Sequence, residues 1–407
     1  MSCLQDGDTD PRGRDSVGAR NDFEVGQSLS SGDTIWQIEA EPTLVLGLLE
    51  GPPEHLFSQI RGATRLSNGT VVVLDGASSQ LRAFSPDGTH LWTAGGPGEG
   101  PGEMRNPTHL ETLPGDTLQV QDGLSRIRYG ADGSVVADEQ LPVEELLEFG
   151  RYYAWECPVP GFVGNRVLAC AGGGFDALDI PRKAGPWRGE TELALLPWTL
   201  DSIAPLGVFL MEEAWALAPE KPLDLPEGIT VLSGTGLGLA SPPMSRKGLF
   251  AVGGWPRRLV VADSWGDRMH AFDLGADHAL PVATIPIRRV RRPPTDDELA
   301  AAWKTASRWS RNSPEYLREH LPAPDSIPNV DHLLVDDLGT VWVGSYRADA
   351  SATRLYHVYD PEGPFLVRVT MPAGVEVLEI GADYVLGITR DALDVERVVL
   401  LNLARNP

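Results

Sequence analysis

Cysteine is scarce in this sequence: the chain of 407 residues has only Cys3, Cys157 and Cys170. No two of them have the Cys-x-x-Cys spacing of a structural zinc site, which argues against the common zinc-bound folds. Cys157 and Cys170 flank the turn-like segment PGFVGN, and their spacing fits either a disulfide across a hairpin or two buried free thiols. A disulfide would place the protein in an oxidising compartment.

Positive charge is also in short supply. The chain has 34 Lys and Arg against 57 Asp and Glu, a formal net charge of −23. Such a chain is repelled by phosphate backbones and by anionic membrane surfaces, so we expect no nucleic-acid partner. The plain consequence of this charge is solubility, and we expect a monomer.

Long apolar runs are missing. No segment approaches the roughly 18 apolar residues of a membrane helix, and no signal-peptide pattern is present. The chain nevertheless begins Met1-Ser2-Cys3 and continues with a polar stretch. This start is similar to that of a mature lipoprotein with a lipid on Cys3, and it fits equally a disordered segment over residues 1–30 with an incidental cysteine.

Signatures of enzymatic chemistry are absent too. The sequence contains no Gly-x-Ser-x-Gly elbow and no His-Glu-x-x-His, and its 8 histidines form no cluster with metal-ligand spacing. GEGPGE at 98–103 lacks the Gly-Lys-Ser/Thr ending of a phosphate loop. We therefore assign no catalytic residue, no metal site and no cofactor.

What the sequence does contain is a repeated hairpin. The chain has 44 Gly and 34 Pro, a composition that favours short strands joined by turns. Each copy has a β run, a polar turn and a second β run that ends in an aromatic residue, as in 69–88, 115–133, 257–273 and 339–363. Weaker copies surround Cys170 and Ile388.

The copies recur with a base period of about 45 residues, which is typical of one four-stranded propeller blade. Six hairpins predict an all-β, six-bladed β-propeller over residues 31–407. The C-terminal segment supplies only three strands, so we expect the strand-like residues 35–49 to complete the last blade. The capping box Thr295-Asp296-Asp297-Glu298 predicts a small helical insertion at 295–321.

Three Asp residues recur at the end of the second β run. Asp75, Asp122 and Asp263 could form a ring of carboxylates that binds a metal or acts as acid and base, but recurrence in several blades favours a structural role in which Asp accepts backbone N–H groups in the hairpin turn.

The hairpins VVVLDGASSQLRAFSPDG and LVVADSWGDRMHAFD resemble the NHL repeat. Together with GGPGEGPGEM at 95–104, they are similar to the bacterial six-bladed NHL-like propellers, many of which are lipoproteins. The resemblance covers about residues 35–403 and is weak in the third blade. The Asn-x-Arg turn of the repeat is only partly present, as in Gly266-Asp267-Arg268. The resemblance implies a fold more firmly than a function.

The long expected connections, 50–58, 95–107, 142–150, 216–248 and 289–330, all join an outer strand to the next inner strand, so they emerge on one face. Loops on one face of a rigid scaffold commonly carry function. The candidate ligand-binding residues lie where the chain enters the inner strands: Arg61, Arg105, His109, Arg246, Asp331 and His332. They would form a polar, partly cationic ring, or they would simply pair with local partners.

Two functions follow from this pattern. The first is a non-catalytic propeller outside the cytoplasm, periplasmic or at the cell surface, which recognises a protein, peptide or glycan partner on the looped face. The alternative is a metal-dependent hydrolase or lyase with its site at the channel mouth, as in the gluconolactonase-type and peptidyl-hydroxyglycine lyase propellers. The latter requires metal ligands that converge from several blades.

Overall fold

The computed structural model describes residues 36–142, 144, 161–172, 183–218, 238–275, 280–289, 291–308, 312–349 and 352–405. The chain divides into two units, residues 1–33 and 34–407, and every described residue belongs to the second. The predicted tether 1–30, with Cys3, therefore lies outside the described residues.

Six antiparallel sheets form the second unit, and in five of them the strands follow one another in sequence. Blade 1 contains β3 (Ile60–Arg65), β4 (Val71–Asp75), β5 (Gln80–Phe84) and β6 (His90–Gly95). Blade 2 contains β7 (Pro107–Leu113), β8 (Thr117–Asp122), β9 (Ser125–Tyr129) and β10 (Val135–Gln140). Blade 3 contains β11 (Phe162–Val163), β12 (Arg166–Gly172), β13 (Gly185–Pro197), β14 (Ala204–Leu217) and β15 (Gly238–Ala240).

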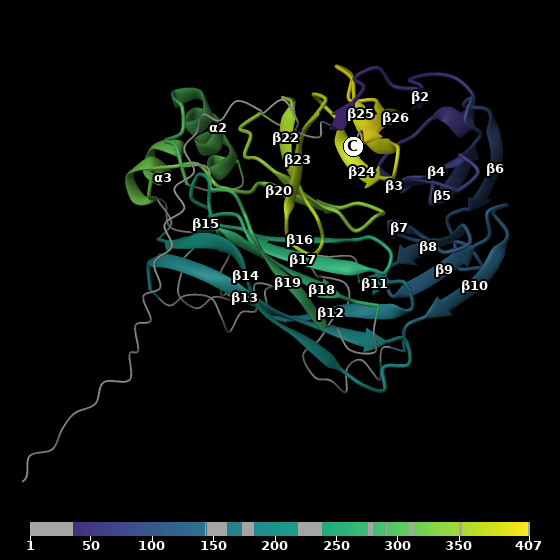
Figure 1. Ribbon diagram of the computed structural model, residues 1–407, viewed down its shortest axis with the longest axis horizontal. Coiled ribbons are helices and arrows are strands. Elements are labelled where there is room, and N and C mark those ends of the chain that lie inside the picture. The colour runs from purple at the N-terminus through teal and green to yellow at the C-terminus, as the bar shows by residue number, and fades with distance from the viewer. Residues whose placement is uncertain are drawn as a thin grey trace, which may run out of the picture. The chain divides into compact units, whose positions relative to one another are not determined.

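The remaining sheets repeat this order. Blade 4 contains β16 (Gly248–Gly253), β17 (Arg258–Asp263), β18 (Arg268–Asp273) and β19 (Leu280–Pro286). Blade 5 contains β20 (His332–Val335), β21 (Val341–Gly344), β22 (Arg354–Tyr359) and β23 (Phe365–Met371). The six-bladed propeller is confirmed, with the first strand of each blade nearest the centre (Figure 1).

Blade 6 joins the two ends of the propeller. It contains β24 (Glu376–Ile380), β25 (Tyr384–Arg390) and β26 (Glu396–Arg405) from the C-terminal side. Its outer edge comes from β1 (Trp36–Ile38) and β2 (Leu44–Leu46), which both pair antiparallel with β26. The predicted closure by residues 35–49 is therefore confirmed from residue 36 onward, and it leaves no open gap in the ring.

The hydrophobic core lies between neighbouring blades. In β4, Val71 and Val73 pack in the cluster shared with blade 6, whereas Val72 and Leu74 pack in the cluster shared with blade 2. Successive strand residues point to opposite faces, so a sheet covered on both faces needs an unbroken apolar run. This need explains the sequence VVVLD.

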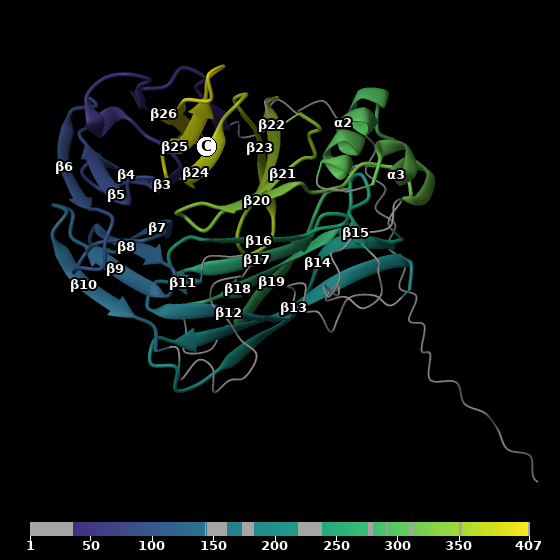
Figure 2. The same ribbon diagram turned by 180° about the vertical axis from the view of Figure 1, so that it is seen from behind.

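The predicted helical insertion is confirmed between blades 4 and 5. It contains α2 (Asp296–Ser307), whose capping box forms between Thr295 and Glu298, and α3 (Pro314–His320). A satellite cluster joins α3 to the ends of β14 and β15, with Leu317 and Leu321 packed against Leu217 and Ala240. Figures 1 and 2 show the two helices beside β15, outside the ring.

Two motifs of the sequence have local structural roles: the loop 98–103 and the cluster of Arg288, Arg289, Arg291 and Arg292. In the loop 98–103, the Glu103 carboxylate accepts the N–H of Gly100 at 2.8 Å, and Gly102 has a φ of +78°, a conformation that favours glycine. In the arginine cluster before α2, Arg292 makes a two-bond ion pair with Glu298 at 2.6 and 2.7 Å.

Candidate functional site

The two ends of the inner strands define two faces of the propeller. We call the end at which β3, β7, β11, β16, β20 and β24 begin the looped face, and the end at which they finish the turn face. The long inter-blade connections and the helical insertion belong to the looped face. Short turns such as 66–70, between β3 and β4, belong to the turn face.

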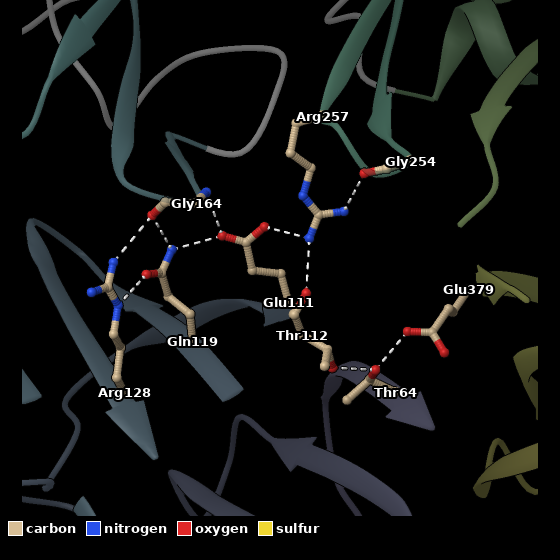
Figure 3. A network of polar contacts seen from close by, with 9 residues as sticks. All are labelled: Thr64, Glu111, Thr112, Gln119, Arg128, Gly164, Gly254, Arg257 and Glu379. Carbon is tan, nitrogen blue, oxygen red and sulfur yellow. Dashed lines mark hydrogen bonds and ion pairs between the residues drawn. The ribbon is translucent and has the colours of Figure 1, made fainter. Parts of the chain in front are cut away.

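A polar network crosses the axis at the turn face (Figure 3). Arg257 follows β16 in blade 4 and donates from Nη2 to Glu111 Oε2 at 2.8 Å and to the Thr112 carbonyl at 3.1 Å, both in blade 2. The other Glu111 oxygen accepts the N–H of Gly164 in blade 3 at 2.8 Å. One carboxylate thus ties three blades together, and removal of either charged partner would leave the other buried without it.

The network continues into blades 1 and 6. The Thr64 hydroxyl on β3 lies 2.6 Å from the Thr112 hydroxyl and donates to Glu379 Oε2 at 2.6 Å. The other oxygen of Glu379 accepts the Arg65 N–H at 3.0 Å and the Tyr384 hydroxyl at 2.5 Å. Glu379 belongs to the last blade and Thr64 to the first, so these bonds hold the seam at which the ring closes.

Burial of Glu379, followed by repulsion from Asp337, raises its pKa to about 7. Burial also raises the pKa of Asp337, reinforced by the charge of Asp336 and opposed by that of Arg257. Two negative charges close together in a poorly solvated site repel each other, which raises the free energy of the doubly ionised state. The two carboxyl groups therefore retain a proton at a pH where isolated carboxyls would be ionised.

The predicted ligand residues lie on several blades of the looped face. Exposed Arg61 contacts Gln59 at 3.4 Å, and exposed Arg105 pairs with Glu99. His109, in the first half of β7, has a pKa lowered by burial and is close enough to feel the charges of Glu111 and Arg257. Arg61 and Arg105 thus have separate local partners.

The other three predicted residues lie near the seam between blades 4 and 5. Asp331 accepts a bond from Arg354 Nη2 at 2.9 Å, and His332 Nδ1 lies 2.8 Å from the Tyr356 hydroxyl. Arg246 donates its backbone N–H to Glu213 at 3.2 Å and lines a small pocket with Trp265. Of the six predicted residues, only Asp331 and His332 share a set of neighbours.

The recurring Asp residues all accept backbone N–H groups, but only Asp263 does so within its own hairpin turn, as predicted. Asp75 accepts the N–H of Ser58 at 3.1 Å, and Asp122 accepts those of Arg105 and Asn106 at 2.9 and 2.6 Å. Each carboxylate fastens the incoming loop to its own blade. Asp263 differs, because it accepts the Trp265 N–H within its hairpin at 2.8 Å and also pairs with Arg188 of blade 3.

The sequence analysis missed the residues with the most extensive contacts. Glu111 and Glu379 are charged residues within the inner strands β7 and β24, and a charge on an inner strand is a signal that could have identified them. Arg257, Arg347 and Arg354 stand at strand ends, where arginine is common, and nothing local distinguishes them. Their partners lie in other blades or across a hairpin.

Cys170 is buried and disulfide-bonded. Cys157 lies outside the described residues, so its pairing with Cys170 stays a prediction.

Within the described ranges, no group of three or more His, Cys, Asp and Glu is placed to hold a metal ion. The same ranges contain no helix long and apolar enough to span a membrane.

No protein-family profile and no curated protein matches the sequence. Solved structures with a similar fold include a Bacteroides fragilis protein described as exported, with 12% identity, 92% and 96% coverage of the two chains and a TM-score of 0.41. A Bacteroides vulgatus member of a family of unknown function has 10% identity, 92% and 100% coverage and a TM-score of 0.48. A calcium-binding regucalcin from Agrobacterium tumefaciens has 8% identity, 92% and 97% coverage and a TM-score of 0.34. These likenesses concern the fold alone.

Proposed function

We propose that this protein is a non-catalytic binding propeller that works outside the cytoplasm and recognises a protein or peptide partner on its looped face. The observation that carries the proposal is the difference between the two faces. Side chains from blades 1, 2, 4 and 6 and a backbone N–H of blade 3 bond to one another at the turn face. Carboxylates and hydroxyls that already bond within the protein have few hydrogen-bonding positions left for a ligand.

The looped face has the opposite character. It carries the helical insertion, the extended end of blade 3 and the loops that precede each inner strand. The disulfide at Cys170 supports an oxidising location, since such bonds persist mainly in exported proteins. A lipid on Cys3 would tether the protein in the same compartment.

Site-specific photo-crosslinking tests this proposal. A photoreactive phenylalanine analogue is placed at Arg105 on the looped face and, as a matched control, at Asp87 in the exposed turn between β5 and β6 on the turn face. Both positions are exposed, so neither substitution disturbs the core. In intact cells of the source organism we expect a discrete crosslinked species from position 105 alone. Crosslinking from position 87 alone would contradict the proposal.

A further inference from the structure

The seam between blades 4 and 5 brings together cations from separate parts of the chain. Lys247 precedes β16, and its N–H donates to Ser264 Oγ at 2.9 Å. The Ser264 carbonyl accepts the N–H of Val330 at 3.0 Å, immediately before Asp331. Ser264 therefore fastens the Lys247 segment and the Asp331 segment to the same point on the looped face.

Arginines from blade 5 approach the same carboxylate. Arg354, at the start of β22, pairs with Asp331 at 2.9 Å, and its side chain is only 12% exposed. Arg347 lies in the connection between β21 and β22, where Nη1 donates to the Ala352 carbonyl at 2.6 Å. The Nε atoms of both arginines are buried and have no acceptor among the described residues.

The electrostatics of neighbouring groups agree with this geometry. Burial, followed by the positive charges of Arg354 and Arg347, lowers the pKa of His332 to about 4. Asp331 feels the charges of Arg354, Lys247 and Arg347. Asp349 also acts on Arg347. Three cations thus share two carboxylates, and His332 is neutral at pH 7, which leaves a local excess of positive charge in a chain of net charge −23.

We propose that Lys247, Arg347 and Arg354 form a receptor for a carboxylate side chain of an acidic peptide segment. Guanidinium groups match the planar, two-oxygen geometry of a carboxylate. The inference rests on the proposed function, because it names the partner chemistry of the same looped face.

A pocket next to this cationic cluster favours a peptide as the source of the carboxylate. It has a volume of about 120 Å³ and is lined largely by apolar side chains, among them Pro242, Met244 and Trp265. Arg246 and Trp265 in its wall are the direct neighbours of Lys247 and Ser264. An apolar side chain beside an acidic one would fill both features, whereas a sugar ring would leave polar hydroxyls against proline.

Fluorescence anisotropy with a labelled deca-glutamate peptide tests the receptor in the full chain at low ionic strength. Overall charge repels this probe, so binding would report a local cationic site. We expect Lys247→Gln and Arg347→Gln each to weaken binding about tenfold, and raised salt to weaken it further. Lys304→Gln and Arg318→Gln are matched controls, because they remove exposed positive charges from the helical insertion on the same face. They should change little.

Absence of deca-glutamate binding, or equal binding by all four variants, would overturn the receptor. Binding of oligogalacturonate without deca-glutamate would make the ligand a glycan and also overturn it. The photo-crosslinking experiment separates the two proposals. If Lys247→Gln and Arg347→Gln still crosslink to the looped-face partner from position 105, the receptor is contradicted and the binding propeller is supported.

Discussion

At the scale of single residues, Glu379 makes the stability of the ring depend on pH. Its pKa is raised from 4.5 to about 7, so the folded chain holds a proton that the unfolded chain has released. The free energy of unfolding contributed by this group therefore falls as the pH rises from about 4.5 to 7. We expect Glu379→Gln, which mimics the protonated acid, to gain about 1–3 kcal/mol relative to wild type across this range. Urea unfolding at several pH values measures the difference.

The difference between the two proteins is the diagnostic quantity. Burial lowers the pKa of His332 and that of His357 to about 4, and these groups contribute stability that grows as the pH rises from about 4 to 6.5. Their slope opposes that of Glu379, so the wild-type curve alone is ambiguous. Because the histidines are common to both proteins, their contribution cancels. Parallel curves would show that Glu379 has no proton to lose.

Arg257 tests the cross-axis network directly. Its side chain is 16% exposed and that of Glu111 is 9% exposed, so Arg257→Gln leaves a nearly buried carboxylate without its cation. We expect a loss of about 2–4 kcal/mol in the free energy of unfolding. Arg268→Gln in the same blade is the control: its side chain is 69% exposed and 4.0 Å from Asp267, so the change should stay within about 0.5 kcal/mol. Equal losses would argue against a special role for the network.

Sequence reasoning could predict contacts that are local and miss those that are not. The bond of Asp263 within its own hairpin was predictable because Asp recurs at that position, whereas the bonds of Asp75 and Asp122 to the preceding loop were not predicted. The bond from Arg257 to Glu111 spans 146 residues, and the bond from Thr64 to Glu379 spans 315. Such pairs depend on how six sheets are arranged around an axis. A single hairpin contains no information about that arrangement.

At the scale of elements, blade 3 is the sheet that the sequence pattern predicts least well. The hairpins of blades 1, 2, 4 and 5 follow the sequence pattern closely, because their buried strands are short and apolar on both faces. In blade 3, β13 and β14 have 13 and 14 residues and extend beyond the pattern. Their polar outer halves, such as WRGE in β13, carry no period that marks a covered strand.

The closing strands provide a test at this scale. Leu44 and Leu46 on β2 are buried in the cluster that joins blades 6 and 1. Deletion of residues 1–49 exposes this cluster and the edge of β26, so we expect a loss of about 5 kcal/mol from these two side chains alone. Thermal unfolding followed by circular dichroism measures the effect. Deletion of residues 1–30 is the control and should leave the transition unchanged; equal transitions for both deletions would contradict the closure.

At the scale of the whole molecule, the two faces divide the chemistry between them. The turn face contains paired carboxylates and arginines that bond blade to blade, and its role is to hold the ring. The looped face has loops, helices and a local excess of cations at the seam of blades 4 and 5. This division explains why the candidate ligand residues and the best-bonded residues are different sets.

Closure through β1, β2 and β26 also has a consequence for how the molecule is made. The last sheet needs strands from both ends of the propeller, so it cannot assemble on the ribosome before residue 405 has been synthesised. Until then, the first and last blades keep apolar faces without a neighbour. Closure of the ring is therefore the last step of folding, and the apolar faces of the first and last blades stay exposed until β26 has paired with β1 and β2.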